Sequence, residues 1–278
     1  MIRLLAIDID GTLLDSRARL PDAHRDALVD ASARGVEIAL VTGRSYHFTK
    51  PIADLLPVPL TLIVNNGALV KTKGGETIVR HVVDRGVARV VLDATQAFED
   101  SVALVFDRPD ERQIVFERMD WSHPNRRGYY ETNKAFIAQV PPPLHGVLTD
   151  DPVQVMFNGS VGPMRRLVAA LRALPVADRM SVAMTEYEPR DFSLVDVTGP
   201  GCSKGATVAG WAASRGWTRD EVAAFGDNLN DVEMLDFAGA AFVMGNAAES
   251  LKSRGYRVTA SHDEQGLAAA IRSLLIDG

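Results

Sequence analysis

Four aspartates in two distant segments have the residue type and spacing of a divalent-cation site. Asp8 and Asp10 are two residues apart after one apolar run, and Asp227 and Asp231 follow another near the far end of the chain. Like charges at short range disfavour ionisation, so a cluster of these carboxylates needs a cation. Mg²⁺ fits two or three carboxylate or carbonyl oxygens together with water and a phosphate oxygen. The aspartates therefore predict a Mg²⁺ site that takes a phosphate group.

Lys204 adds a second positive charge to this prediction. It stands at the start of a predicted helix near residues 203–215, where the macrodipole disfavours a positive charge by roughly 0.3–1 kcal/mol. A lysine at that position needs an anionic partner, and Asp8 or a phosphoryl group would serve. Taken alone, Lys204 fits a plain surface position and Asp8 fits a turn cap, so the prediction depends on the segments converging.

Apolar runs that are typical of buried parallel strands precede the polar residues. Residues 3–9, 36–41 and 60–64 form three such runs, and helical patterns follow the first two. Strands that alternate with helices in this way predict a right-handed βαβ series. We therefore expect an α/β fold with a doubly wound, mostly parallel Rossmann-like sheet.

The polar segments after the predicted strands should converge at one edge of this sheet. Besides the loops that carry Asp8 and Asp227, these segments are Thr42-Gly43-Arg44 and Asn65-Asn66-Gly67. In open parallel sheets, ligands bind outside the carboxyl ends of the strands, at a topological switch point. We therefore expect a single site built from all four loops.

The pattern changes between about Val82 and Arg190. Apolar runs at 102–106 and 113–116 are close enough to pair as a hairpin, and further strand-like and helical segments follow in mixed order. Mixed order with hairpins is typical of an α+β module. We therefore predict a split core domain, residues 1–81 and 191–278, that holds an inserted domain of residues 82–190.

The composition argues against several classes of protein. The 278 residues carry a net charge of −6, so no basic surplus drives binding to nucleic acid or an anionic membrane. The basic and aromatic run at 126–130 is interpreted as ordinary surface of the insert. Cys202 is the only cysteine, which excludes an intramolecular disulfide and a thiolate metal cluster. No stretch approaches the roughly 20 apolar residues of a membrane helix. The segment before Asp8 is too short for a signal peptide, so we expect a cytoplasmic location.

Four motifs, in this order, resemble those of the haloacid-dehalogenase (HAD) superfamily. They are Asp8-Ile9-Asp10-Gly11-Thr12-Leu13-Leu14, Val41-Thr42-Gly43-Arg44, Lys204-Gly205 and Gly226-Asp227-Asn228-Leu229-Asn230-Asp231-Val232-Glu233-Met234-Leu235. The long fourth motif, with Met244-Gly245-Asn246-Ala247 after it, is similar to the Cof-type (class IIB) branch. That resemblance implies an HAD-like core with an inserted C2B-type cap. His262 stands where it leads us to expect asparagine, so the His262–Asp263 loop is given no role.

The resemblance also implies a role for each residue. Asp8 would be the nucleophile that forms an aspartyl-phosphate, and Asp10 would be the general acid and then the general base. Mg²⁺ would bind Asp8, Asp227 and the backbone carbonyl of Asp10, while Asp231 would orient metal-bound water or Lys204. The groups expected to hold phosphate or substrate are Thr42, the Gly43 amide, the catalytic Lys204 and Asn230, with Arg44 and Asn66 near the edge of the cap.

These roles predict a magnesium-dependent phosphatase that hydrolyses a small phosphorylated metabolite, such as a sugar phosphate or a phosphorylated cofactor. The cap would close over the site and exclude water. Two alternatives remain: a phosphotransferase or phosphomutase with the same catalytic set, and a non-enzymatic phospho-receiver or ligand sensor. Receivers lack a second acid two residues after the first, so Asp10 favours an enzyme. The sequence does not identify the substrate, the cap residues that select it or the oligomeric state.

Overall fold

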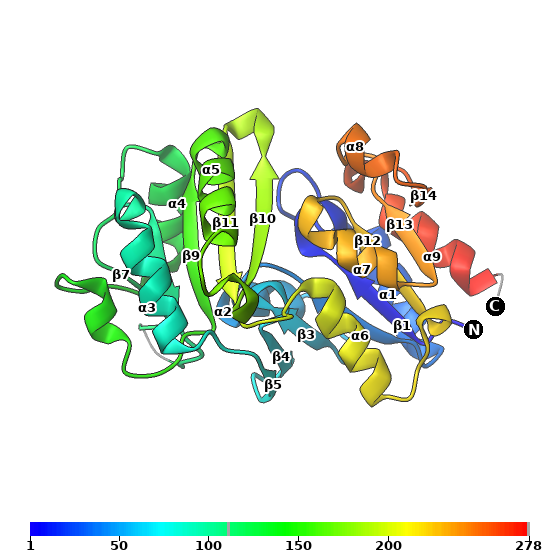
Figure 1. Ribbon diagram of the computed structural model, residues 1–278. Coiled ribbons are helices and arrows are strands. Elements are labelled where there is room, and N and C mark those ends of the chain that lie inside the picture. The colour runs from blue at the N-terminus through cyan, green and yellow to red at the C-terminus, as the bar shows by residue number, and fades with distance from the viewer. Residues whose placement is uncertain (110–111, 277–278) are drawn as a thin grey trace. The chain divides into compact units, whose positions relative to one another are not determined.

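The computed structural model describes residues 1–109 and 112–276, which form two compact units (Figure 1). The core unit comprises Met1–Val79 and the chain from Ser203 onward, and the inserted unit comprises Arg80–Cys202. Each unit has its own sheet and its own cluster of buried apolar side chains.

An eight-stranded sheet in the order β14-β13-β12-β1-β2-β3-β4-β5 forms the core unit. Its six parallel strands are β1 (Leu4–Ile7), β2 (Glu37–Val41), β3 (Thr61–Val64), β12 (Val222–Gly226), β13 (Ala240–Val243) and β14 (Arg257–Val258). β4 (Leu69–Thr72) runs antiparallel to β3, and β5 (Thr77–Arg80) forms the edge; the sequence did not predict these two strands. The chain passes from β1 to β2 on one side and returns as β12 on the other, so the topological switch point lies at β1.

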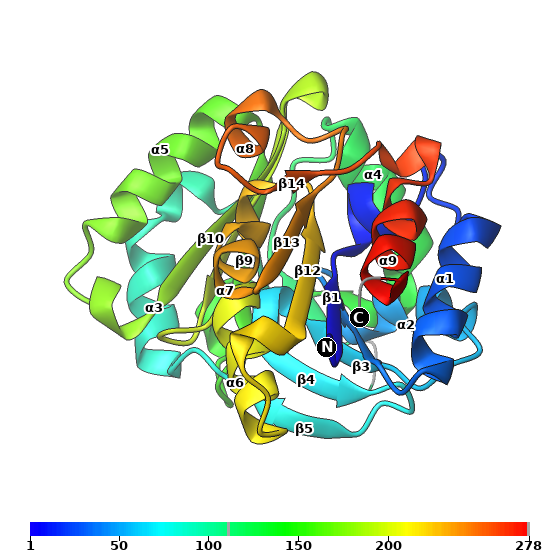
Figure 2. The ribbon, with the colours of Figure 1, turned by 90° about the vertical axis from the view of Figure 1, so that its right-hand side faces the viewer.

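Helices cover both faces of this sheet (Figure 2). α1 (Asp22–Ala33) and α9 (Gly266–Ile276) pack together on one face, and α6 (Lys204–Ser214) and α7 (Val232–Phe237) pack together on the other. Two shorter helices are α2 (Tyr46–Asp54) and α8 (Glu249–Lys252). Residues of β1, β2 and β12 share a buried cluster with residues of α6 and α7, which explains why these strands are largely apolar. The predicted doubly wound α/β core is confirmed.

The inserted unit contains a six-stranded sheet in the order β10-β11-β9-β6-β7-β8. Its strands are β6 (Val102–Val105), β7 (Ile114–Phe116), β8 (Ile137–Gln139), β9 (Gln154–Gly159), β10 (Ser181–Tyr187) and β11 (Phe192–Thr198), and its helices are α3 (Arg85–Ala94), α4 (Pro124–Asn133) and α5 (Val161–Arg172). β6 and β7 pair antiparallel, as the predicted hairpin requires. Apolar residues of α3 and α5 are buried against one face of the sheet. This is the expected α+β arrangement.

The boundary of the inserted unit differs from the predicted one. We expected the insert to end at residue 190, whereas the unit runs to Cys202 and includes β11. β11 follows β10 across a turn at Asp191, whose φ is +42°, and it pairs antiparallel with β10 on one side and β9 on the other. The alternating apolar pattern of a strand does not indicate which sheet the strand joins. Here β11 joins the sheet of the inserted unit because it forms a hairpin with β10.

The basic and aromatic run at 126–130 of the inserted unit begins with a buried arginine. Arg126 is 8% exposed and its guanidinium donates to Asn158 Oδ1 at 2.5 Å, to Asn158 O at 2.5 Å and to Ser101 Oγ at 3.0 Å. These hydrogen bonds connect α4 to β9. Burial lowers the pKa of the Arg126 guanidinium. Interpreting the whole run 126–130 as surface was therefore wrong for Arg126.

Among the helices in the described ranges, none is both long and apolar enough to cross a bilayer.

Candidate active site

The polar loops of the core unit lie side by side at the carboxyl ends of its parallel strands. The Asp8 amide, after β1, donates to Phe225 O of β12 at 3.0 Å, and the Thr42 amide, after β2, donates to Ile63 O of β3 at 2.9 Å. The Asn66 amide donates in turn to Thr42 O at 3.0 Å. The four loops that the sequence predicted to converge are therefore held next to one another at the switch point.

Three carboxylates meet at this point. Oxygens of Asp8, Asp227 and Asp231 all lie within 4.8 Å of one another. Asp8 and Asp231 are buried, and Asp227 Oδ1 is buried with no hydrogen-bond partner among residues 1–109 and 112–276. A buried oxygen without a partner is costly unless a ligand or ion satisfies it. Hard oxygen donors and an unsatisfied carboxylate oxygen fit a Mg²⁺ ion.

Gly11 allows the loop after β1 to approach Asp227. Its φ is +83°, and a Cβ on Gly11 would lie 2.2 Å from Asp227 Oδ2. Glycine is the residue that adopts this backbone conformation without steric cost and leaves the space that the carboxylate occupies. The Asp10–Gly11 segment and Asp227 are therefore adjacent because position 11 has no side chain.

Lys204 lies between two of the carboxylates. Its Nζ donates to Asp8 Oδ1 at 2.5 Å and to Asp231 Oδ1 at 2.7 Å, and its side chain is 1% exposed. Lys204 is the first residue of α6, whose N-cap Ser203 accepts from the Ala206 amide. A buried cation at a helix N-terminus needs anionic partners, as the sequence suggested. The sequence suggested Asp8 or a phosphoryl group as the anionic partner of Lys204, and the structure places Asp8 in contact with it.

Asp231 is fully engaged within the protein. Its Oδ2 accepts from the amides of Asp227 and Asn228, both at 3.0 Å, while its Oδ1 accepts from Lys204. A Cβ on Gly226 would lie 2.6 Å from Asp231 Cβ, so glycine at 226 makes room for this contact. Asp231 therefore fixes the turn that carries Asp227 and orients Lys204.

Burial and crowding change the proton affinities in this cluster. Burial raises the pKa of Asp8 to about 8 against the opposing effect of Lys204, and the Asp231 charge adds to the rise. Burial, then the charges of Asp8 and Asp231, raises the pKa of Asp227 well above its usual value. Burial opposes the charge on Lys204, but the Asp231 and Asp8 carboxylates outweigh it and raise the lysine pKa. One lysine does not balance three carboxylates, so the cluster favours a further cation.

Asp10 has different surroundings from Asp8. Its two carboxylate oxygens accept from Arg44, Nε to Oδ2 at 2.7 Å and Nη2 to Oδ1 at 2.6 Å. The Arg44 amide donates to Thr42 Oγ1 at 3.1 Å. We expected Arg44 near the edge of the cap as a substrate contact, and the structure pairs it with Asp10. This two-point contact fixes the orientation of the Asp10 carboxylate.

The remaining predicted binding residues form a second group. Asn230 Nδ2 donates to Asn66 Oδ1 at 3.0 Å. A Cβ on Gly43 would lie 3.2 Å from Asn66 Nδ2, so Gly43 is in close contact with the same amide. Thr42 is buried beside them, with its carbonyl bonded to the Asn66 amide. The structure thus brings Gly43, Asn66 and Asn230 together.

Sequence reasoning missed Asn246. Its Nδ2 donates to Gly11 O at 2.9 Å and lies 3.5 Å from Asp227 Oδ2. The residue was noted as part of Met244–Ala247 but received no role, because nothing in that run indicates a partner more than 200 residues earlier in the chain.

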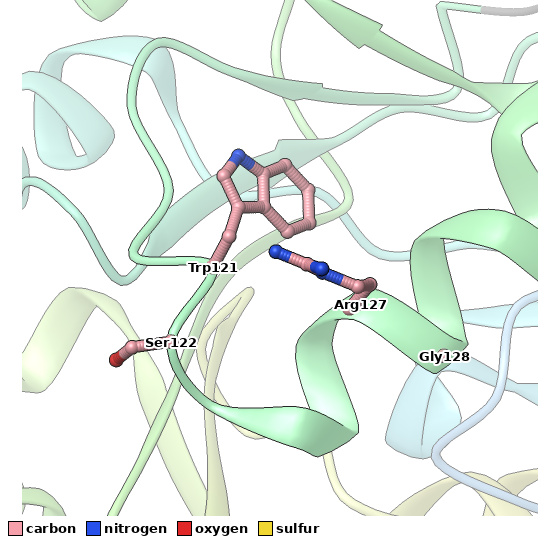
Figure 3. A pocket seen from close by; sticks show the side chains of 4 residues that line it. All are labelled: Trp121, Ser122, Arg127 and Gly128. Carbon is pink, nitrogen blue, oxygen red and sulfur yellow. The ribbon is translucent and has the colours of Figure 1, made fainter.

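The inserted unit has a surface hollow of about 540 Å³ lined by Trp121, Ser122, Arg127 and Gly128. Figure 3 shows the Arg127 guanidinium pointing toward the indole ring of Trp121. The Trp121 ring also contacts Tyr130, with ring centroids 5.0 Å apart. These lining residues include none of those predicted for the site.

A model of the haloacid dehalogenase-like hydrolase family matches residues 5–271. The chain belongs to this family. The match covers all the motifs quoted above, so the expected resemblance to the superfamily and to its Cof-type branch is confirmed.

Several curated relatives of this HAD hydrolase carry the names of phosphatases. Pyridoxal phosphate phosphatase YbhA of Escherichia coli (strain K12) is 26% identical over 279 residues, covering 99% of each chain. The 5-amino-6-(5-phospho-D-ribitylamino)uracil phosphatase YcsE of Bacillus subtilis (strain 168) is 25% identical, covering 98% of this chain and 95% of its own. The solved structure of BT1666 from Bacteroides thetaiotaomicron, described among the phosphatases of the HAD superfamily, shares the fold with a TM-score of 0.80 at 24% identity, covering 99% of this chain and 96% of that one. The predicted enzyme class, an HAD phosphatase, is confirmed.

Proposed function

We propose that this HAD phosphatase hydrolyses a small phosphate monoester through an aspartyl-phosphate on Asp8, with Mg²⁺ as cofactor. The observation that carries the proposal is the buried contact of Lys204 with Asp8 and Asp231, next to Asp227. Lys204 holds one Asp8 oxygen and so orients the carboxylate. A cation fixed beside the nucleophile also attracts the anionic phosphoryl group.

The reaction proceeds in two displacements at phosphorus. In the first, an Asp8 oxygen bonds to phosphorus and the bond from phosphorus to the leaving oxygen breaks, while Asp10 donates its proton to that oxygen. In the second, Asp10 takes a proton from water, the water oxygen bonds to phosphorus, and Asp8 departs as a carboxylate. The products are an alcohol and inorganic phosphate, and Asp10 regains its proton.

The phosphoryl oxygens are assigned to fixed donors. These are Lys204, the Thr42 hydroxyl, the Gly43 amide and Asn230, with Asn66 behind Asn230. Support comes from the hydrogen bond that locks Asn230 to Asn66 and from the close contact of Gly43 with the same side chain. Phosphoryl transfer depends chiefly on positioning and charge stabilisation, which such an array supplies.

The Mg²⁺ ligands are assigned to Asp8, Asp227 and the backbone carbonyl of Asp10. Asp231 is left out because Lys204 and two amides already occupy its oxygens. A bound Mg²⁺ neutralises charge on the phosphoryl oxygens. Two observations support this choice of ligands. Asp227 Oδ1 has no hydrogen-bond partner in the described part of the chain, and the Asp10 side chain is paired with Arg44, which leaves its backbone carbonyl as the ligand.

We assign the substrate to sugar phosphates or phosphorylated cofactors, and substrate selection to the inserted unit. The names of the relatives support the class, since YbhA is a phosphatase of pyridoxal phosphate and YcsE one of a phosphoribityl compound. A panel of phosphorylated metabolites, assayed for phosphate release with Mg²⁺, identifies the substrate.

The nucleophile is tested by Asp8→Asn. We expect phosphate release from a generic aryl phosphate to need Mg²⁺, to stop when the metal is chelated and to fall to background in this variant. The matched control is Asp54→Asn, which makes the same change on α2, where Asp54 pairs with Lys50 at the surface. Undiminished release by Asp8→Asn would overturn the proposal. Transfer of labelled phosphate to an added sugar instead of water would replace hydrolysis by phosphotransfer.

A further inference from the structure

Asn246 joins three segments of the core unit that are distant in sequence. It follows β13, and its side-chain amide donates to Gly11 O at 2.9 Å in the loop of residues 9–20, which we call the Asp10 loop. The same nitrogen lies 3.5 Å from Asp227 Oδ2, and its Oδ1 accepts from the His262 amide at 3.0 Å. Both functional atoms of the Asn246 side chain are thus in use.

Close packing holds Asn246 in this position. The preceding Gly245 lies so near the chain at 259–261 that a Cβ there would be 2.9 Å from Ser261 N. The Met244 amide donates to Gly226 O at 3.0 Å, and the Gly245 amide donates to Ala260 O at 3.2 Å. The turn that carries Asn246 is therefore fixed between β12 and the segment before His262.

The loop behind Asn246 also reaches the Asp10 loop directly. Asp263 Oδ1 accepts from the Ser16 amide at 2.9 Å, and this hydrogen bond lowers the pKa of Asp263. Ser261 and Glu264 close a reciprocal cap around the turn, which holds Asp263 in place. The Asp10 loop is therefore tied to the C-terminal part of the chain at Gly11, through Asn246, and at Ser16.

We infer that Asn246 is a positioning residue that, backed by the His262–Asp263 loop, holds the Asp10–Gly11 backbone against Asp227. This inference rests on the proposed function, in which the Asp10 carbonyl and Asp227 are two of the Mg²⁺ ligands. The Asn246 amide nitrogen lies 2.9 Å from Gly11 O and 3.5 Å from Asp227 Oδ2, so it can donate a hydrogen to each of these oxygens. Groups that orient metal ligands from outside the coordination sphere typically change metal affinity or activity by roughly 10- to 100-fold when removed.

The contact between Asn246 and residue 262 does not depend on the side chain at position 262. The group that binds Asn246 is the main-chain N–H of His262, which every residue except proline provides. The histidine side chain is therefore not needed for this contact.

The test measures Mg²⁺ binding and backbone exchange, neither of which needs turnover. In Asn246→Ala we expect the Mg²⁺ dissociation constant from titration calorimetry to rise roughly 10- to 100-fold. We also expect amides of residues 9–20 to exchange hydrogen faster in the metal-free protein. Asp263→Ala should change both quantities in the same direction, and Asp263→Asn, which keeps an oxygen for the Ser16 amide, should restore them.

The control is Tyr256→Phe, which removes a 2.6 Å hydrogen bond to Asp236 in the same part of the chain, away from the hydrogen bonds that hold the Asp10 loop at Gly11 and Ser16. It should leave both quantities unchanged. Wild-type affinity and wild-type exchange in Asn246→Ala overturn the inference, and if that variant does not fold, equal values in Asp263→Ala and Asp263→Asn overturn it. Absence of Mg²⁺ binding by the unmodified protein would instead overturn the proposed metal site, so the two failures are distinguishable.

Discussion

Asp8 and Asp10 stand two residues apart and yet have opposite surroundings. The Asp8 side chain is 7% exposed and in contact with Lys204, whereas the Asp10 side chain is 38% exposed and held by Arg44. A fixed, buried carboxylate suits attack on phosphorus, and a more accessible one suits exchange of protons with a leaving group and with water. The structure therefore supports different roles for the two acids.

Replacement of Asp10 by asparagine separates proton transfer from metal binding. The variant keeps an oxygen for Arg44 but has no proton to give, so we expect kcat to fall by roughly 10²–10⁴. The Mg²⁺ dissociation constant should stay the same, because the Asp10 ligand is the backbone carbonyl. Steady-state kinetics and titration calorimetry measure the two quantities, and either an unchanged kcat or a loss of Mg²⁺ binding in Asp10→Asn would refute the assignment.

His24 makes stability depend on pH at a distance from the acid cluster. Its Nδ1 lies 2.9 Å from Leu13 O, and its Nε2 is buried without a partner in the described part of the chain. Burial lowers the pKa of His24, and the neighbouring His262 adds to this effect. The unfolded chain takes up a proton on this histidine below about pH 6.5, whereas the folded chain resists it. The folded state thus binds fewer protons, and stability falls as pH falls below that value.

His24→Asn tests this sign. Asparagine can still donate to Leu13 O but does not titrate. Between about pH 7.5 and about pH 5.5, the free energy of unfolding should drop more in the wild type than in the variant. Urea denaturation across that pH range measures the free energy of unfolding of both proteins. The contributions of carboxyl groups to its pH dependence are the same in the two proteins and cancel in the comparison. Parallel curves for the two proteins would show that His24 does not contribute.

At the scale of elements, two glycines position α6 and hence Lys204. A Cβ on Gly205 would lie 2.4 Å from the carbonyl carbon of Glu233, and a Cβ on Gly67 would lie 2.4 Å from Ser203 O. α6 therefore begins in close contact with α7 and with the loop after β3. This contact places Lys204 beside Asp8 and Asp231.

Gly205→Ala should push α6 away from α7 and move the adjacent Lys204. We expect a loss of stability of roughly 1–3 kcal/mol and a lower kcat. Gly210→Ala, on the exposed side of the same helix, is the matched control, because its added Cβ would meet no described atom within 4 Å other than those of its chain neighbours and its own helix backbone. That change should stabilise the protein by up to about 1 kcal/mol. Denaturant unfolding and phosphate release compare the two, and equal effects would contradict the close-contact account.

The sequence predicted the parts of the site that depend on sheet topology. Apolar runs identified the strands, and parallel strands bring their carboxyl ends to one edge, so the meeting of Asp8, Lys204 and Asp227 followed. The pairing of Arg44 with Asp10 depends on side-chain conformation, which residue spacing does not determine. The partners of Asn246 and the sheet that β11 joins depend on contacts between distant segments, which a single sequence does not reveal.

At the scale of the molecule, the proposed chemistry is confined to one of two units. Asp8, Asp10, Lys204 and Asp227 all belong to the core unit, although the insert separates them in the chain. The inserted unit has an apolar core of its own between its sheet and the helices α3 and α5. Each unit can therefore respond to a ligand separately.

Mg²⁺ should stabilise the core unit selectively. A ligand that binds only the folded state adds about 2.7 kcal/mol at 100 times its dissociation constant. At that concentration, hydrogen exchange should slow in β1 and β12 and stay unchanged in β6 and β9. Exchange detected by mass spectrometry resolves these strands, and equal slowing in both units would contradict a metal site confined to the core unit.

The most direct test of the account is capture of the covalent intermediate. The protein is mixed with Mg²⁺ and a phosphate ester, quenched with acid during turnover, and digested for peptide mass spectrometry. We expect one phosphoryl group on the peptide that contains Asp8, and none on the same peptide of Asp8→Asn. A phosphoryl group on any other residue, or rapid turnover with Asp8 unmodified at every quench time, would contradict it.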